Sequence, residues 1–368
     1  MTSKQFLILS CNTGGGHNAT AAAMKEEIER QGHRAIVLDY LALTNDGMSR
    51  RICDFYATTV RHAPHFFGAC YWGNMFLSAS HVPSSSYYQG IPIARALRGY
   101  LSESSFDGII ATHLYAAEGL SYLKRHGATL PKTVAISTDY ICHPYWEYLD
   151  CDYHIIPHED LIEQFVARGI RPSKLYPYGI PVRNQFKQKK SQEKAREELG
   201  LSLHGDLFLV MAGNSGTGHI RKLVDEALSK TGAGMVAVLC GNNKRLYSNL
   251  NDSFSQNSRV RVTGPVNNVA DWMAACDVLF SKPGGLTSTE ALVQNVPLVH
   301  TAPIPGCETA NAEFFAEHGL SFSAHTIKKQ IQCGSALVED PRIWREMKSL
   351  QAKNARPDSA EKILSLIS

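Results

Sequence analysis

The sequence has no apolar run of the roughly 18 residues that a membrane-spanning helix requires. We therefore expect any contact with a membrane to be peripheral. The first apolar stretch, residues 6–10, is too short for the hydrophobic region of a signal peptide and runs into a glycine-rich turn. The nine cysteines are odd in number and include no Cys-x-x-Cys pair, which argues against a disulfide framework and favours a reducing, cytoplasmic compartment.

Charge is also scarce. Charged residues make up 19% of the chain and the net charge is +3, which argues against a strong binder of polyanions. We expect no nucleic-acid partner, while a local basic face toward an anionic membrane stays open. Two histidine pairs lack a third metal ligand at suitable spacing: His62 with His65, and His154 with His158. We expect no bound metal and no cofactor.

The chain does contain a regular alternation of apolar strands, turns and amphipathic helices. Apolar residues make up 44% of its 368 residues, which is a globular composition and too long for one ordinary core. The opening strand–loop–helix–strand order predicts an α/β fold with a parallel, doubly wound sheet. The charged segment 187–198 is expected to be a solvated connecting helix. We place an N-terminal domain at 1–185 and a C-terminal domain at 186–368, whose last helix could pack back on the first domain.

A glycine loop joins the first strand to the first helix and ends in His17, where that helix begins. The loop lacks the Gly-x-Gly-x-x-Gly spacing of dinucleotide-binding loops. Because a helix N-terminus disfavours an imidazolium, His17 should be neutral, which suits a general base. A capping or packing role for His17 is the alternative.

Two further polar residues follow strands of the first half. His113 ends an apolar run that begins at residue 107, and Asp139 ends one that begins at residue 133. Ligands gather at the carboxyl ends of the strands in open parallel sheets, so both residues should lie near His17. Asp139 could orient or charge-pair a catalytic imidazole, and it could equally cap a turn.

Residues 45–105 mix aromatic and basic side chains. Such a mixture suits a membrane interface, where rings sit at headgroup depth and cations meet anionic lipid. A pair of amphipathic core helices with a loop is the alternative. The residues concerned are Phe55, Tyr56, Phe66, Phe67, Tyr71, Trp72, Phe76, Tyr87 and Tyr88, with Arg50, Arg51, Arg61, Arg95 and Arg98.

The second half repeats this organisation, with strands expected at 207–211, 235–239, 260–264, 277–280 and 296–300. A second glycine loop, 213–219, follows the first of these strands. In the segment 281–290, two glycines and several hydroxyls precede a helix. Bare N–H groups and the positive end of the helix dipole suit a phosphate there, and the missing Cβ atoms let a ligand approach the backbone. A capping box formed by Thr287 and Glu290 is the alternative.

Five motifs stand in an order that resembles one family of enzymes. They occupy residues 13–17, 213–218, 264–266, 282–290 and 305–311. The order is similar to that of the monogalactosyl- and monoglucosyl-diacylglycerol synthases, which are relatives of the bacterial peptidoglycan glycosyltransferase that adds N-acetylglucosamine to a lipid-linked precursor. The resemblance spans nearly the whole chain. Each motif alone is weak, but five in order are specific.

The resemblance implies a GT-B glycosyltransferase, with two Rossmann-like domains facing across a cleft. The second domain would hold a UDP-sugar and the first a lipid acceptor, diacylglycerol, at the inner face of an anionic membrane. The reaction would invert the anomeric carbon and need no metal. His17 would deprotonate or orient the acceptor hydroxyl. The nucleotide-sugar site would comprise Gly15, Gly16, Gly213, Ser215, Gly216, Thr217, Gly218, Gly241, Val266, Gly284, Gly285, Thr287, Glu290, Cys307, Glu308 and Asn311.

These residues divide by the part of the donor that they would hold. Residues 213–218 and Thr287 would hold the diphosphate, and Glu290 the ribose hydroxyls, since a carboxylate can accept two hydrogen bonds from a diol. The uracil would lie near Gly241 and Val266, and the sugar near the group Cys307, Glu308 and Asn311.

One departure from the family pattern concerns the sugar. Many of these synthases have glutamine where this chain has Cys307, and a thiol is a poor hydrogen-bonding group. The donor sugar therefore stays open among glucose, galactose and N-acetylglucosamine. A UDP-sugar 2-epimerase, or a UDP-N-acetylglucosamine-dependent transferase with another acceptor, is the alternative function.

Overall fold

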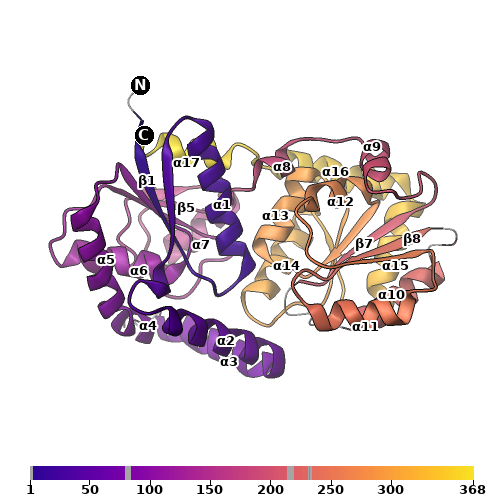
Figure 1. The fold of residues 1–368 in the computed structure, drawn as a ribbon, viewed down its shortest axis with the longest axis horizontal. Helices are drawn as coiled ribbons and strands as arrows, with labels where there is room; N and C mark the ends of the chain where they lie inside the picture. The colour runs from indigo at the N-terminus through magenta and orange to yellow at the C-terminus, as the bar shows by residue number, and fades with distance from the viewer. Residues whose placement is uncertain (1–2, 79–83, 214–218, 231, 233) are drawn as a thin grey trace. The chain divides into compact units, whose positions relative to one another are not determined.

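The computed structural model describes residues 3–78, 84–213, 219–230, 232 and 234–368 (Figure 1). The chain divides into two compact units. Unit 1 comprises Met1–Asn184, Pro305–Cys307 and Arg356–Ser368, and unit 2 comprises Gln185–Ile304 and Glu308–Ala355. Among the residues described, no helix combines the length and the apolarity needed to cross a membrane.

Unit 1 contains a six-stranded sheet in which every neighbouring pair is parallel, in the order β2-β1-β3-β4-β5-β6. Its strands are β1 (Gln5–Ser10), β2 (Arg34–Asp39), β3 (Gly108–Ala111), β4 (Lys132–Ile136), β5 (Tyr153–Ile155) and β6 (Leu175–Tyr176). The chain leaves β1 to β2 on one side and continues with β3 on the other. The carboxyl ends of β1 and β3 therefore flank the switch point of this sheet, the usual ligand position in such folds.

The helices of unit 1 include four between β2 and β3. They are α1 (Gly15–Arg30), α2 (Asp46–His62), α3 (Pro64–Ser78), α4 (Ser85–Gln89), α5 (Ile91–Glu103), α6 (Leu114–Arg125), α7 (Ile162–Ala167) and α17 (Ser359–Ser365), with short 3-10 turns η1 (Tyr40–Ala42), η2 (Trp146–Tyr148), η3 (Glu159–Leu161) and η4 (Pro172–Lys174). The helix α8 (Asn184–Lys187) crosses the boundary into unit 2.

The core of unit 1 joins both ends of the chain. Met24 and Ile28 of α1 pack with Phe6 of β1, because helical spacing puts them on one buried face. Ile363 and Leu364 of α17 lie in the same cluster, and Figure 1 shows α17 beside α1. The C-terminal helix is thus an integral part of unit 1.

Unit 2 repeats the parallel architecture in the order β12-β11-β10-β7-β8-β9. Its strands are β7 (Leu207–Met211), β8 (Met235–Leu239), β9 (Val260–Thr263), β10 (Val278–Ser281), β11 (Leu298–His300) and β12 (Phe322–Ser323). The chain runs outward from β7 to β9 and returns to β10 on the other side of β7. The switch point of this sheet therefore lies between the carboxyl ends of β7 and β10.

The helices of unit 2 are α9 (Gln192–Glu198), α10 (Ile220–Lys230), α11 (Lys244–Phe254), α12 (Val269–Ala275), α13 (Gly285–Gln294), α14 (Cys307–Glu317), α15 (Ile327–Glu339) and α16 (Pro341–Asn354). The first residue of α14, Cys307, is grouped with unit 1 and the rest of that helix with unit 2. The core is built from strand residues such as Phe208 and Phe280, packed against Leu223 and Val224 of α10.

The expectation of a solvated helix at 187–198 is wrong in one respect. Arg196 of α9 is only 4% exposed. Its guanidinium donates to the Ala275 carbonyl at 3.0 Å and to an Asp277 carboxylate oxygen at 2.7 Å. A paired and hydrogen-bonded cation can be buried, so this charged segment is an anchored part of unit 2.

Candidate active site

The loop between β1 and α1 is held by a chain of polar side chains at the switch point of unit 1. Asn12 donates to Asp39 at 2.7 Å, and Asn18 donates to Asn12 at 2.6 Å. Ser10 closes the chain by donating to Asn18 at 2.6 Å. These bonds tie the loop to the ends of β1 and β2, so the first turn of α1 has a fixed position.

His17 lies in that first turn, after Gly15 and Gly16, with Gly14 as the N-cap. Its Nδ1 atom lies 2.7 Å from the carbonyl oxygen of Thr112, at the end of β3. A carbonyl oxygen only accepts, so Nδ1 carries the proton and the neutral ring presents the lone pair of Nε2. The hydroxyl of Thr138 lies 3.2 Å from the same Nδ1 atom. This tautomer leaves Nε2 as the atom that can remove a proton from a ligand hydroxyl.

His113 sits against His17, with ring centroids 4.4 Å apart. Its Nδ1 accepts the N–H of Tyr115 at 3.1 Å as the N-cap of α6. The neutral ring therefore carries its proton on Nε2, which lies 2.9 Å from the Thr13 hydroxyl. Burial holds the pKa of His113 well below its ordinary value, and the neighbouring His17 lowers that pKa further. His113 is thus a neutral support for the glycine loop.

The pKa of His17 is lowered from its ordinary value, chiefly by burial. Asp139 opposes this effect and raises the pKa, and so does the bond to Thr112, whereas His143 lowers it. The carboxylate of Asp139 lies 3.1 Å from His143 Nε2, and His143 Nδ1 lies 3.2 Å from the Tyr71 hydroxyl. The structure therefore brings Asp139 into the electrostatic environment of His17.

Sequence reasoning missed Thr138, His143 and Tyr71 in this group. His143 follows Asp139 by four residues, a spacing that could have suggested a pair. Nothing local connects either of them with Tyr71 of α3, which is 72 residues away from His143 in the chain. Such a contact exists only once the chain has folded.

In unit 2, Gly213 and the 281–285 turn stand at the switch point. Gly213 follows β7 with a φ of +63°, a left-handed conformation that glycine adopts without strain. Ser215, Gly216, Thr217 and Gly218 lie outside the described residues. Gly284 is the N-cap of α13, with Gly285 as the first helical residue. The cap makes no side-chain hydrogen bond, and the first turn has no acidic residue, so these N–H groups suit an anionic ligand.

Thr287 and Glu290 lie inside α13 rather than at its cap. Because Gly284 is the N-cap, Thr287 is the third helical residue and cannot form a capping box with Glu290. The capping-box alternative is therefore wrong. Thr287 is half-buried and Glu290 is buried. Both lie in the first two turns of α13, the helix that follows the 281–285 turn.

Lys282 is the cation of this part of unit 2. Its ammonium lies 2.9 Å from a Glu308 carboxylate oxygen, and the other Glu308 oxygen accepts the Ile304 N–H at 2.7 Å. A Cβ atom on Gly213 would lie 3.6 Å from Lys282 Cε, so this side chain reaches across to the first glycine turn. Asn311 donates to the Pro283 carbonyl at 2.9 Å. Glu308 and Asn311 are therefore held beside the 281–285 turn, whereas Cys307 is grouped with unit 1.

The remaining two donor-site candidates lie at the same edge of the sheet. Gly241 follows β8 with a φ of +52°, and Val266 follows β9 and is half-buried. Parallel strands end at one edge, so both lie on the side of the sheet that carries the two glycine turns.

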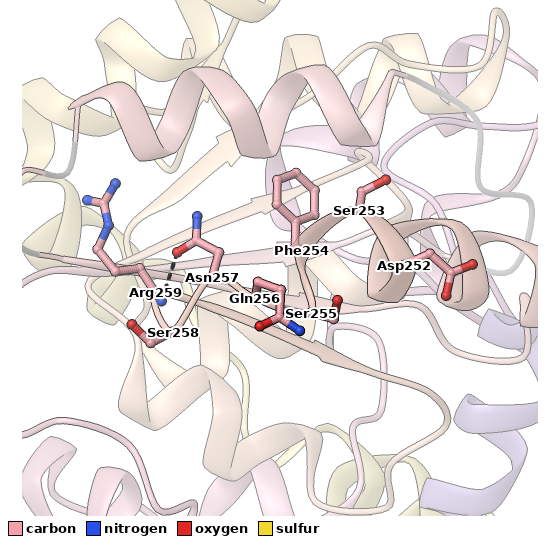
Figure 2. A pocket seen from close by; sticks show the side chains of 8 residues that line it. All are labelled: Asp252, Ser253, Phe254, Ser255, Gln256, Asn257, Ser258 and Arg259. Carbon is pink, nitrogen blue, oxygen red and sulfur yellow. Dashed lines mark hydrogen bonds between the residues drawn. The ribbon is translucent and has the colours of Figure 1, made fainter.

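A surface pocket of unit 2 lies elsewhere. It is lined by residues 252–259, from the end of α11 to the residue before β9 (Figure 2). It therefore opens at the amino end of β9, opposite to the edge that carries the glycine turns. No predicted site residue lines it.

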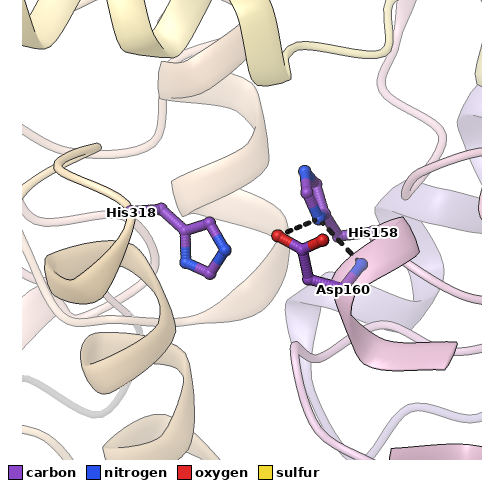
Figure 3. A group of neighbouring side chains, drawn as sticks. All are labelled: His158, Asp160 and His318. Carbon is purple, nitrogen blue, oxygen red and sulfur yellow. Dashed lines mark hydrogen bonds and ion pairs between the residues drawn. The ribbon is translucent and has the colours of Figure 1, made fainter. Parts of the chain in front are cut away.

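Two of the histidines considered as metal ligands, His154 and His158, are buried in unit 1. His158 Nδ1 accepts the Asp160 N–H at 3.2 Å as the N-cap of η3, a contact that Figure 3 shows. His154 of β5 is 1% exposed, and burial lowers its pKa to about 4. His318, also drawn in Figure 3, belongs to unit 2, where its Nδ1 lies 2.7 Å from the Phe314 carbonyl oxygen.

Comparison with known proteins shows which proteins the chain resembles. The family described as monogalactosyldiacylglycerol (MGDG) synthase matches residues 17–182. The chain is 27% identical to a processive diacylglycerol beta-glucosyltransferase of Bacillus licheniformis, over 99% of this chain and 94% of that protein. It is 28% identical to the chloroplastic monogalactosyldiacylglycerol synthase of Spinacia oleracea, over 98% of this chain and 71% of that protein.

Solved structures share the architecture at low identity. MurG of Acinetobacter baumannii aligns with a TM-score of 0.64 at 15% identity, over 99% of both chains. Anabaena Alr3699/HepE in complex with UDP-glucose aligns with a TM-score of 0.58 at 16% identity, over 99% of this chain and 98% of that one.

The fold is GT-B, in which two Rossmann-like domains form one glycosyltransferase, as the sequence predicted. Within that class, the chain is similar to the monogalactosyl- and monoglucosyl-diacylglycerol synthases, and it is a hexosyltransferase.

Proposed function

We propose that this protein transfers a hexose from a UDP-sugar to diacylglycerol at a membrane surface, with inversion at the anomeric carbon and without a metal. His17 Nε2 removes the proton of the acceptor hydroxyl as that oxygen attacks the anomeric carbon. The bond to the diphosphate breaks and UDP leaves. A single displacement of this kind inverts the configuration. The acceptor class follows the two relatives, which are named for diacylglycerol glycosylation.

The observation that carries the proposal is the tautomer of His17. The bond from Nδ1 to the Thr112 carbonyl leaves Nε2 as a proton acceptor, and the depressed pKa keeps it unprotonated near neutral pH. A glycosyltransferase that acts on a hydroxyl needs a proton acceptor of this kind in its acceptor domain.

The donor side is supported by the chemistry of unit 2. A departing diphosphate needs positive charge, which the uncapped N-terminus of α13 and the Lys282 ammonium supply in this unit. Glu290, buried two turns into α13, offers the carboxylate oxygens that suit a ribose diol. The related fold of Anabaena Alr3699/HepE binds UDP-glucose, which agrees with a UDP-sugar donor.

A membrane surface is supported by exposed apolar side chains on α2, α3 and α4, which we call the apolar patch. Soluble surfaces seldom expose so many large apolar side chains on neighbouring helices unless they meet a partner or a membrane. Arg50 and Arg51 are exposed on α2 as well, and cations there suit anionic lipid. The patch comprises Phe55 (71% exposed), Phe66 (62%), Trp72 (49%), Phe76 (81%), Leu77 (56%) and Tyr88 (57%).

The test is release of UDP from UDP-glucose, UDP-galactose and UDP-N-acetylglucosamine, each with and without diacylglycerol in anionic vesicles. We expect release that depends on diacylglycerol with one donor, a product of inverted configuration by NMR, and the same rate after treatment with EDTA. Inhibition by EDTA would contradict the metal-free mechanism.

The other outcomes separate the alternatives. Conversion of a UDP-sugar into its 2-epimer without any acceptor would point to an epimerase. Release that depends on a different acceptor would keep the transferase and replace diacylglycerol. The donor that supports turnover would also show what Cys307 accommodates in place of the glutamine found in many relatives.

A further inference from the structure

Three side chains of unit 1 form a hydrogen-bonded row that the proposed mechanism does not yet use. The Tyr71 hydroxyl lies 3.2 Å from His143 Nδ1, and His143 Nε2 lies 3.1 Å from Asp139 Oδ2. The two rings meet edge to face, with centroids 5.9 Å apart. Tyr71 comes from α3, whereas His143 and Asp139 come from the segment after β4. The row thus connects a helix of the apolar patch to the carboxyl edge of the sheet.

The positions of the protons in this row follow from its ends. A carboxylate only accepts, so His143 Nε2 donates to Asp139. In the neutral tautomer of His143, Nδ1 then carries the lone pair and the Tyr71 hydroxyl donates to it. Burial raises the pKa of Tyr71, so the phenol keeps its proton. Each polar atom between the phenol and the carboxylate is then either a hydrogen-bond donor or an acceptor.

The row ends one residue after Thr138, whose hydroxyl lies 3.2 Å from Nδ1 of the candidate base His17. The charged or titratable groups that act on His17 are Asp139, which raises its pKa, and His143, which lowers it, with the neutral ring of His113 in contact. The first turn of α1 contributes no acidic residue. Asp139 is therefore the anion that supports the imidazolium formed when His17 takes a proton, and its orientation matters to that step.

We propose that Tyr71 and His143 are positioning residues of the transfer reaction, which hold the Asp139 carboxylate where it supports His17. The inference rests on the proposed function, because it assigns a role in the same proton transfer. His143 fixes one carboxylate oxygen, and Tyr71 fixes the rotamer and the tautomer of His143. Neither residue touches the reacting atoms. Tyr71 lies on α3, the helix that also bears Trp72 and Phe76. The row therefore attaches this helix to the carboxyl edge of the sheet in unit 1.

The experiment compares Tyr71→Phe, His143→Leu and His143→Gln with the wild type in the vesicle assay. Phenylalanine removes only the hydroxyl, and leucine removes both hydrogen bonds. Glutamine keeps one donor and one acceptor at similar separation, so it is the conservative variant. We expect His143→Leu to lower kcat about tenfold or more, a part of the roughly 10²- to 10⁴-fold contribution of a general base. We expect the KM for the UDP-sugar to stay unchanged and His143→Gln to restore most of kcat.

The pH profile gives a readout that loss of packing alone would not move. Asp139 raises the pKa of His17, so a carboxylate that is no longer held should leave the pKa lower. The acidic limb of kcat/KM for Tyr71→Phe should therefore move to lower pH, with a lower plateau. UDP binding by calorimetry reports on the donor site of each variant.

Three results decide the matter. A wild type without lipid-dependent UDP release overturns the proposed function. The positioning role of Tyr71 and His143 in that reaction then falls with it. An active wild type with unchanged kcat and pH profile in Tyr71→Phe and in folded His143→Leu overturns the positioning role alone. If His143→Leu does not fold, Tyr71→Phe and His143→Gln decide. An equal loss of kcat in these two variants, without a shift of the pH profile, also contradicts the positioning role.

Discussion

The Nδ1 atom of His17 lies 2.7 Å from the carbonyl oxygen of Thr112. A histidine at the start of a helix therefore has a defined tautomer, held by the residue that follows β3. The bond joins two residues that are 95 positions apart and fixes which nitrogen faces a ligand.

The first prediction concerns the base itself. His17→Ala should lower kcat by roughly 10²- to 10⁴-fold while UDP still binds, because the donor site belongs to unit 2. Since burial lowers the pKa of His17 below 6.5, wild-type kcat/KM should stay level near neutral pH and fall only on acidification below that value, as Nε2 takes a proton. His204→Ala, at an exposed histidine of unit 2, is the matched control. A fall that begins above pH 7, or near-native turnover in the alanine variant, would contradict the assignment.

The second prediction concerns the cation of unit 2. Lys282→Ala removes the charge that lies 2.9 Å from Glu308 and reaches the Gly213 turn. Calorimetry should show UDP binding weakened by about tenfold or more, which corresponds to about 1.4 kcal/mol. Lys230→Ala, at the exposed far end of α10, should leave the affinity unchanged. Equal affinities in the two variants would remove Lys282 from the diphosphate site.

Most of the sheet could be predicted from the sequence. Strands such as β1 and β10 are apolar runs bounded by turn residues, so their pattern is visible without tertiary structure. The two-residue strands β6 and β12 are too short to carry any pattern, and the sequence analysis missed them. Arg196 was misassigned for another reason, since its partner Asp277 lies 81 residues away.

The site was only partly predictable, for the same reason. His17 and the 281–290 segment are visible because glycines and a helix start stand beside them in the chain. The tautomer of His17, the pairing of Lys282 with Glu308 and the row from Tyr71 to Asp139 depend on contacts across 26 to 95 residues. A local sequence pattern predicts the residue types of a site, whereas their proton positions and hydrogen-bond partners depend on the fold.

The third prediction tests the packing beneath η1. A Cβ atom on Gly119 would clash with the Tyr40 hydroxyl oxygen and would lie 2.6 Å and 2.9 Å from the Tyr40 ring carbons Cζ and Cε2, so Gly119→Ala overpacks this part of unit 1. Urea unfolding should show a loss of about 1–3 kcal/mol. Tyr40→Phe removes the hydroxyl oxygen but keeps the two ring carbons of the clash, so it should relieve only part of the strain. The double variant should still be more stable than the two single effects added together. Gly99→Ala, on α5 with open space around it, should instead stabilise by about 0.5–1 kcal/mol. Strict additivity would mean that the hydroxyl is not the obstacle.

The last prediction concerns the apolar patch. Phe66 and Phe76 are 62% and 81% exposed on α3, so their side chains are already in water and add little to the core. At a membrane each ring would leave water, worth about 1.5–3 kcal/mol. Replacing both with serine should therefore weaken binding to anionic vesicles by at least about tenfold in a sedimentation assay.

The fold and the donor site should be untouched by these two changes, so UDP affinity and the unfolding midpoint are the internal controls. Leu203→Ser, at a leucine that is 46% exposed in unit 2, is the matched surface control and should bind vesicles like the wild type. If the double serine variant still sediments with vesicles to the native extent, the lipid surface meets some other part of the chain. The patch brings the enzyme to its acceptor if two results are found together. Vesicle binding falls, and UDP release falls only when diacylglycerol is presented in vesicles.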